Sequence, residues 1–171
     1  ADRLLSCDTL LFHGSVIAID GEGYLFTAKS GTGKSTHTRL WREYFGERAV
    51  MVNDDKPLLH ITDSGVTAYG TPWDGKHRLS TNTAVPLKGI CILTRDTTNY
   101  IEQAEPHATY PMIVQQTNRS LSADGMKQTL SLIDRMLNVV PVYRLGCNMD
   151  IKAARVAYEG MNRLKNRRKD A

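Results

Sequence analysis

Short apolar runs separated by turn-forming residues are the main feature of the first half of the chain. Residues 9–20 and 24–28 are two such runs, and the segment 20–23 between them, Asp-Gly-Glu-Gly, is typical of a hairpin turn. Runs of this length suit strands better than helices. Beyond the strand within 9–20, the predicted strands are 24–28, 49–52, 58–62, 66–70, 86–93, 99–103 and 139–145.

Helical periodicity is the main pattern in the second half of the chain, and it also occurs in the segment that begins at residue 34. The predicted helices are 34–45, 107–116, 123–137 and 151–164. On the first of these, one face carries Leu40, Trp41, Tyr44 and Phe45, and Gly46 marks the C-terminal end. Because the hairpin neighbour of strand 24–28 must run antiparallel to it, we expect an α/β fold with a mixed β-sheet, built as a single domain over residues 1–171.

The segment 28–36, Ala-Lys-Ser-Gly-Thr-Gly-Lys-Ser-Thr, matches the phosphate-binding loop G-x-x-x-x-G-K-[ST], with Ala28 in place of the first glycine. A predicted strand precedes it and a predicted helix follows it, as this loop requires. Gly31 and Gly33 let the backbone curl so that N–H groups point at phosphate oxygens. Lys34 adds a positive charge, and the Ser35 hydroxyl is a ligand for Mg²⁺. The predicted nucleotide-binding residues are Ser30, Gly31, Thr32, Gly33, Lys34, Ser35 and Thr36.

Two carboxylates, Asp54 and Asp55, follow the apolar run 49–52 and Asn53. Ligands of α/β sheets collect at the carboxyl ends of strands, so the pair is expected beside the phosphate loop. One acid can hold Mg²⁺, a cation that prefers oxygen ligands, and the other can accept a proton from an attacking hydroxyl. The structural alternative is a turn cap before Pro57, and the phosphate loop upstream favours the functional interpretation.

The stretch 71–83 has no clear periodicity and contains Lys76 and Arg78. Long loops within compact domains are uncommon and are frequently functional. A cation brought over the γ-phosphate stabilises the charge that develops during phosphoryl transfer, which makes these two residues candidate catalytic groups. The alternative is a solvated basic loop.

Charge and composition exclude several classes of protein. The net charge of +4 comes from the tail 163–171, with five basic residues and one acid; without it the charges balance. We therefore do not expect a nucleic-acid partner, and regard the tail as a frayed end. No apolar run is long enough for a membrane span, and no signal-peptide pattern is present. Three widely spaced cysteines suggest reduced thiols and a cytosolic protein.

The order of these motifs resembles the HPr kinase/phosphorylase family, whose fold is akin to that of the phosphoenolpyruvate carboxykinases. The likeness spans residues 10–55: a His-Gly pair, a hairpin, Ser-Gly-x-Gly-Lys-Ser, and a strand ending in Asp-Asp. In that family a histidine and an aspartate handle the proton of an acceptor serine, and Mg²⁺ bridges the nucleotide. The resemblance implicates His13, Lys34, Ser35, Asp54 and Asp55, and it makes self-association plausible. The chain is more like a compact relative of the kind found beside peptide-modifying enzymes.

The expected function is therefore an ATP- and Mg²⁺-dependent kinase that phosphorylates a hydroxyl, preferably a serine of a protein or peptide. We expect Lys34 to hold the phosphates, Ser35 and Asp55 to hold the metal, and Asp54, helped by His13, to be the base. Lys76 or Arg78 would neutralise charge in the transition state. The alternatives are a small-molecule kinase, a carboxykinase-like enzyme, and a module that senses ATP without consuming it.

Overall fold

The hairpin predicted around residue 20 is formed by β2 (Ser15–Ile19) and β3 (Glu22–Thr27). In the computed structural model, which describes residues 2–166, these strands are antiparallel, with Ile19 opposite Glu22. The two residues of the turn, Asp20 and Gly21, have φ values of 51° and 83°. Positive φ at both positions is what a tight type I′ turn demands, and the Asp-Gly sequence supplies it at low cost.

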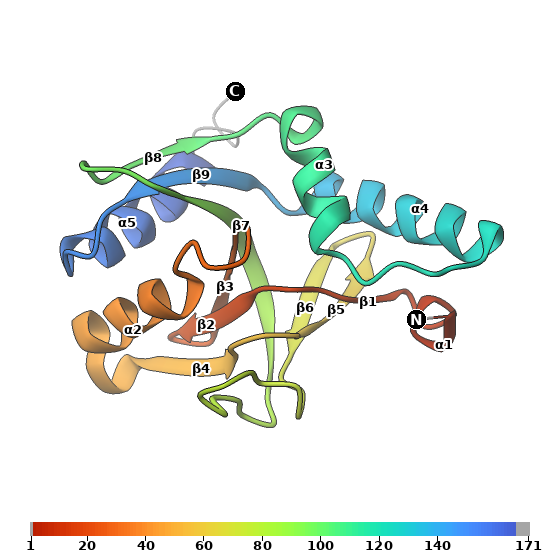
Figure 1. Cartoon of the computed structure of the whole chain (residues 1–171), viewed down its shortest axis with the longest axis horizontal. Helices are drawn as coiled ribbons and strands as arrows, with labels where there is room; N and C mark the ends of the chain where they lie inside the picture. Colours follow the sequence, from red (N-terminus) through yellow and green to blue (C-terminus); the bar gives the residue numbers. More distant parts are fainter. Residues whose placement is uncertain (1, 167–171) are drawn as a thin grey trace.

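The strands form one curved mixed sheet (Figure 1). Its order is β1-β5-β6-β7-β3-β2-β4, and β9 pairs with β7 and with β8. The pairs β3–β7 and β7–β9 are parallel, whereas the remaining pairs are antiparallel. The expected α/β fold with a mixed sheet is therefore confirmed. The other strands are β1 (Thr9–Leu11), β4 (Ala49–Asn53), β5 (Leu58–Thr62), β6 (Gly65–Tyr69), β7 (Ala84–Arg95), β8 (Tyr100–Gln103) and β9 (Val142–Cys147).

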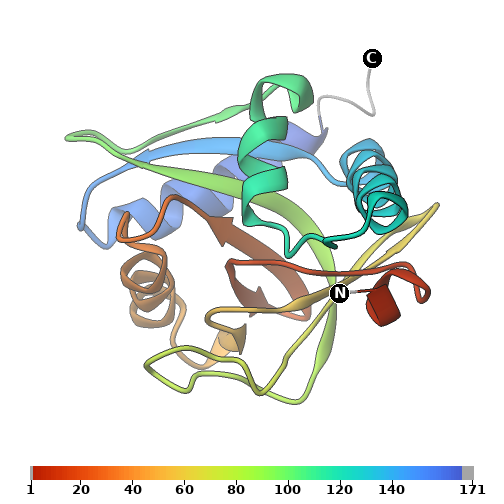
Figure 2. The same cartoon turned by 45° about the vertical axis from the view of Figure 1, so that its right-hand side comes forward.

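The long strand β7 holds the two parts of the sheet together. Its first residues, 84–86, pair with β6, and its later residues pair with β3 on one edge and β9 on the other. Figures 1 and 2 show β7 running through the molecule from the β6 side to the β8 side. Strands β3 and β4 are both antiparallel to β2, so their carboxyl ends lie at the same end of the sheet, where the glycine-rich loop follows β3.

Helices cover both faces of the sheet, which is why its central strands are apolar on both sides. Strand β3 shows this best, because Leu25 packs toward one core and Tyr24 and Phe26 toward the other. The first core lies against α3 and α4, and the second against α2 and α5 (Figure 2). The helices are α1 (Asp2–Leu5), α2 (Lys34–Phe45), α3 (Pro106–Gln116), α4 (Ala123–Val139) and α5 (Lys152–Asn166), with a 3-10 turn at Gly46–Arg48.

Three details differ from the sequence predictions. Tyr44 is 43% exposed, and the buried face of α2 carries His37 together with Leu40 and Trp41. The strand expected from residue 139 begins at Val142, because α4 extends to Val139 and Pro141 then prevents a further helical turn. The short helix α1 had no sequence signal.

The structure describes residues 2–166 and therefore only part of the basic tail. Most of the basic tail predicted at 163–171 lies outside the described residues, which end at 166. Among the helices within 2–166, none combines the length and the apolar character that crossing a bilayer would take.

Candidate functional site

The glycine-rich loop, residues 28–34, connects β3 directly to α2. Gly31 and Gly33 have φ values of 77° and 119°, which side chains with a Cβ rarely adopt. Helix α2 then begins at Lys34 with no side-chain cap and no acid in its first turn. The first N–H groups of a helix lack intrahelical partners, so this end is open to an anion.

Arg95, at the end of β7, binds the backbone of the glycine-rich loop through its side chain. Its guanidinium donates to the carbonyl oxygen of Gly31 at 2.6 Å and more weakly to that of Thr32 at 3.4 Å. These bonds occupy carbonyl groups of the loop, whose Thr32 N–H donates to the backbone oxygen of Lys29 at 3.1 Å. Nothing in the sequence marked Arg95, because strand β7 meets the loop only through the parallel pairing of β3 and β7.

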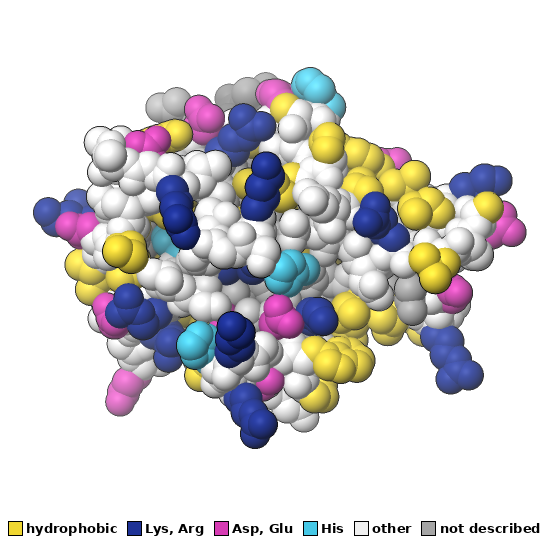
Figure 3. All heavy atoms as spheres, in the orientation of Figure 1, with side chains coloured by type: hydrophobic (Ala, Val, Ile, Leu, Met, Phe, Trp, Pro, Cys, Tyr) yellow, Lys and Arg dark blue, Asp and Glu magenta, His cyan; other side chains and the backbone are white. Residues whose placement is uncertain are grey.

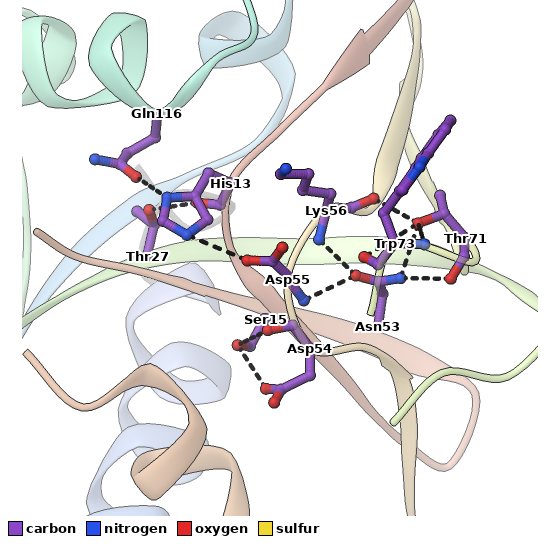
Figure 4. Close-up of polar contacts among 10 residues, drawn as sticks. All are labelled: His13, Ser15, Thr27, Asn53, Asp54, Asp55, Lys56, Thr71, Trp73 and Gln116. Atoms are coloured by element: carbon purple, nitrogen blue, oxygen red, sulfur yellow. Dashed lines mark hydrogen bonds and ion pairs between the residues drawn. The ribbon is translucent and has the colours of Figure 1, made fainter. Parts of the chain in front are cut away.

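Asn53, the last residue of β4, shapes the turn that carries the two carboxylates. Its Oδ1 accepts the backbone N–H of Asp55 at 2.9 Å and of Lys56 at 2.7 Å (Figure 4). Its Nδ2 donates to the backbone oxygen and the hydroxyl of Thr71, each at 3.0 Å. An Asn at this place is a typical turn signal, so it could have been recognised beforehand. The bonds anchor the 71–80 loop to the acidic turn.

Asp54 is held in a fixed orientation by a buried hydroxyl. The Oγ of Ser15 donates to the Oδ1 of Asp54 at 2.9 Å and to its backbone oxygen at 3.1 Å. Asp54 is only 5% exposed, and Ser15 is fully buried. One carboxylate oxygen is thus occupied by Ser15, and the side chain has a single orientation.

His13 connects Asp55 to helix α3. Its Nε2 lies 3.4 Å from the Oδ1 of Asp55, and its Nδ1 lies 2.8 Å from the Oε1 of Gln116 (Figure 4). The backbone is fixed too, because the oxygen of His13 accepts from the hydroxyl of Thr27 at 2.9 Å. We expected His13 to assist Asp54; in the structure the histidine contacts Asp55, and Asp54 is held by Ser15.

These groups converge on one cavity of about 530 Å³, which we call the carboxylate cavity. It is lined by His13, Ser30, Gly31, Gly33, Lys34, Ser35, Thr36, Asp54, Asp55, Gly75, Lys76 and His77. Burial lowers the pKa of the Lys34 ammonium from its ordinary value, although the negative charges of Asp55 and then Asp54 raise it in part. Figure 3 shows acidic, basic and histidine side chains gathered near the middle of this face. Lys34 and both acids therefore share one electrostatic environment.

The 71–80 loop covers one side of this cavity. Gly75 has φ 72°, and a Cβ at this position would lie 3.2 Å from the Cβ of Asp55, so the close approach requires glycine. Lys76, the candidate catalytic cation, lines the cavity, and His77 lines it without any sequence signal. Arg78 is exposed and is not among the lining residues. Thr32 lines neighbouring cavities instead.

The residues present suit Mg²⁺ as a partner of a bound nucleotide. Within residues 2–166, no group of three or more His, Cys, Asp and Glu side chains is arranged to hold a metal by itself. Mg²⁺, however, is usually held by one or two carboxylates together with substrate phosphates. Asp54, Asp55 and the Ser35 hydroxyl provide that incomplete set beside the loop.

A second cavity, of about 420 Å³, meets the carboxylate cavity at His13. We call it the Trp73 cavity; its lining is Leu11, Phe12, His13, Lys56, Trp73, Gln115, Gln116, Thr117 and Asn118. Trp73 is 56% exposed and leaves much of its indole open. The imidazole of His13 can therefore be approached from two directions.

Comparison with known proteins gives a distant structural likeness only. No family model matches the chain, and no curated protein matches it either. Among solved structures, the chain is similar to one described as the Hpr(Ser) kinase/phosphatase from Coxiella burnetii, with 12% sequence identity. The match covers 94% of this chain and 95% of that one, with a TM-score of 0.49. The functional proposal therefore rests on the side chains of the site.

Proposed function

We propose that the chain is a kinase that binds a nucleoside triphosphate with Mg²⁺ and transfers the γ-phosphoryl group to a serine hydroxyl of a protein or peptide. The observation that carries the proposal is the carboxylate cavity, where the open end of α2 and Lys34 face two carboxylates and a histidine. A loop that only binds phosphate has no need of a fixed acid–imidazole pair.

The triphosphate is held by the loop N–H groups, by Lys34 and by the first turn of α2. When bound, Mg²⁺ would neutralise charge on the β and γ phosphates, with Ser35 and a carboxylate as its protein ligands. We assign that carboxylate to Asp54, because the Ser15 hydroxyl occupies one of its oxygens and fixes the direction of the other. This reverses the division between the two acids expected from the sequence.

Asp55 then acts on the acceptor hydroxyl. Its Oδ1 contacts the Nε2 of His13, and the Nδ1–H of that ring donates to Gln116, which leaves Nε2 able to share a proton with the carboxylate. As the new O–P bond forms and the bond to the β-phosphate oxygen breaks, the hydroxyl proton passes to the Asp55–His13 pair and the diphosphate leaves. Lys76 is positioned to offset negative charge at the mouth of the cavity.

The Trp73 cavity is the path by which the acceptor approaches. Its lining includes His13 and no residue of the glycine-rich loop, and it carries an exposed indole and Lys56. An aromatic surface beside a catalytic pair suits a polypeptide better than a small polar metabolite, because it can contact side chains flanking the serine.

The test is intact-mass analysis of candidate peptides, proteins and hydroxyl-bearing metabolites incubated with the protein, ATP and Mg²⁺. We expect one added phosphoryl group on a serine, lost when Lys34 is replaced by Ala. Phosphorylation of metabolites alone would contradict the choice of acceptor. Nucleotide binding without transfer to any acceptor would favour a sensing module instead.

A further inference from the structure

A third cavity lies on the other side of the glycine-rich loop and is not used by the proposed chemistry. It measures about 540 Å³, and we call it the Met149 cavity. Its lining is Gly31, Thr32, Gly33, Thr36, His37, Leu40, Arg95, Asp96, Cys147, Asn148 and Met149. Gly33 and Thr36 line both this cavity and the carboxylate cavity, so the start of α2 is the partition between them.

We propose that the Met149 cavity binds the nucleoside of the triphosphate, an inference that rests on the proposed function. A nucleotide has two ends, and its γ-phosphate must reach Asp54 and Asp55. When the phosphates lie along the first turn of α2, the nucleoside extends to the side of this turn opposite the carboxylate cavity. There, Gly33 and Thr36 form the nearer wall of the Met149 cavity. The far walls include Leu40, Cys147 and Met149, apolar groups that suit the face of a base.

Met149 is a suitable cover for such a site. Its side chain is 78% exposed although it lines a cavity, so apolar surface is left open to water. A thioether side chain has several rotatable bonds and a polarisable sulfur, and it adapts well to an aromatic ring. Burial of this surface against a base removes it from water.

His37 is the second, independent observation. The ring is 2% exposed, and its Nε2 lies 3.0 Å from the indole nitrogen of Trp41. Because an indole N–H can only donate, Nε2 accepts and the proton of the neutral ring resides on Nδ1. Burial lowers the pKa of His37 to about 3, so the ring is neutral near pH 7. Nδ1 is buried and has no acceptor among the described residues, and His37 is one of the residues that line the cavity, so a ligand with acceptor atoms that draws the ring toward the cavity would satisfy this donor.

A rival location is the cavity between the loop, the end of strand β7 and helix α3. Its volume is about 530 Å³, and it is lined by Lys29, Ser30, Gly31, Thr32, Ile92, Leu93, Thr94, Arg95 and Met112. It does not include Gly33 or Thr36, so it borders the loop but not the first turn of α2. No buried polar atom in its lining lacks a partner within the described chain. These two differences favour the Met149 cavity.

The cysteines provide the direct test. Cys147 lines the Met149 cavity and is partly exposed, whereas Cys7 is exposed and lines none of the three cavities beside the loop. The rate of alkylation at each thiol is measured by peptide mass spectrometry with ATP, with GTP and with tripolyphosphate. At a ligand concentration of about ten times its dissociation constant, we expect nucleoside triphosphate to slow labelling of Cys147 about tenfold. Cys7 should be unaffected, and tripolyphosphate should leave Cys147 nearly as reactive as in the free protein.

Two results would overturn the inference while leaving the kinase proposal intact. One is saturation with ATP, established by calorimetry, with unchanged labelling of Cys147. The other is equal protection by tripolyphosphate, which would mean that the loop itself closes over the thiol. Failure of ATP and GTP to bind at all would instead overturn the proposed function together with the inference.

A matched pair of substitutions tests His37. His37→Gln keeps an acceptor near the position of Nε2 and removes the donor at Nδ1, whereas His37→Asn keeps a donor near Nδ1 and removes the partner of Trp41. We expect His37→Gln to weaken ATP binding about fivefold without changing tripolyphosphate binding, and His37→Asn to retain ATP affinity. Met112→Ala, in the rival cavity, should leave ATP affinity unchanged; if it weakens binding and His37→Gln does not, the nucleoside lies there.

Discussion

Two cavities of nearly equal volume, about 530 and 540 Å³, lie on opposite sides of the start of helix α2. The carboxylate cavity is lined by charged and titratable groups, three of which are held by other parts of the chain: Asp54 by Ser15, His13 by Gln116, and Asp55 by His13. The Met149 cavity combines the apolar side chains of Leu40, Cys147 and Met149 with polar groups, and its charged lining residues are Arg95 and Asp96. They share the backbone of the glycine-rich loop and differ in almost everything else.

The difference separates two tasks that a phosphoryl-transfer enzyme must perform. Chemistry needs rigid, ordered charges, which the bonds from Ser15, Asn53 and His13 provide. Recognition of a base needs apolar surface and a few directional bonds. Substitutions on the carboxylate side should therefore change the rate of transfer, and substitutions on the other side should change affinity for the nucleotide.

The largest effect is expected from Asp55→Asn. Loss of the proton acceptor should lower kcat for phosphoryl transfer by about 10²- to 10⁴-fold. The affinity for ATP and the protection of Cys147 by ATP should persist, because the Met149 cavity is untouched. Transfer is followed by mass spectrometry and binding by calorimetry; transfer at the full rate would show that Asp55 is not the base.

A smaller effect is expected from Ser15→Ala, which removes the hydroxyl that orients Asp54. A hydrogen-bond partner of a metal-binding carboxylate typically contributes about 10- to 100-fold to metal affinity or activity. We expect the Mg²⁺ concentration needed for half-maximal transfer to rise within that range, and Ser15→Thr to restore part of it. A lower kcat with unchanged Mg²⁺ dependence would place the metal elsewhere.

Gly75→Ala tests the covering loop. The substitution combines a positive φ with a Cβ placed 3.2 Å from the Cβ of Asp55. The matched control is Gly21→Ala, because Gly21 has φ 83° and no atom within 4 Å of the added Cβ. Both variants should lose about 1–2 kcal/mol of unfolding free energy in urea titrations. Only Gly75→Ala should also slow transfer, and equal activity of the two variants would mean that the loop does not position Asp55.

The smallest expected effect on transfer belongs to the other side of the loop, where the prediction is a pH dependence of stability. The folded-state pKa of His37 is lowered to about 3 by burial, against 6.5 for an unperturbed histidine. Between these values the unfolded chain binds the proton and the folded chain does not, so stability falls as the pH falls below about 6.5. The loss is about 1.4 kcal/mol for each pH unit.

Denaturant titrations from pH 7 to pH 5 measure this slope. His37→Gln cannot titrate and keeps an acceptor for Trp41, so its stability should fall less steeply with acid than that of the wild type. Equal slopes in the two proteins would show that the His37 ring is solvated in the folded state.

Local signals predicted most of the secondary structure and its order. Helix α2 and strand β4 formed within a residue or two of their predicted limits, because periodicity and glycine positions are local properties. Boundaries failed where two signals competed, as at Val139, where apolar residues suited both the end of α4 and the start of a strand. Tyr44 was misplaced because the burial of α2 is concentrated in its earlier turns, at His37, Leu40 and Trp41, whereas Tyr44 near the C-terminal end is 43% exposed.

The sequence by itself determined the glycine-rich loop, the mixed character of the sheet and the presence of two acids at the end of β4, because each depends on neighbours in the chain. The partners of those acids were decided only in three dimensions. His13 and Gln116 are 103 residues apart, and Ser15 and Asp54 are 39 apart. Which acid meets the histidine follows from the pairing of β2 with β4 and from the bond between the Gly14 N–H and the backbone oxygen of Asp55. That Arg95, Cys147 and Met149 surround the far side of the loop follows from how β3, β7 and β9 pair. Strand pairing joins distant segments through backbone hydrogen bonds that carry no local sequence signal.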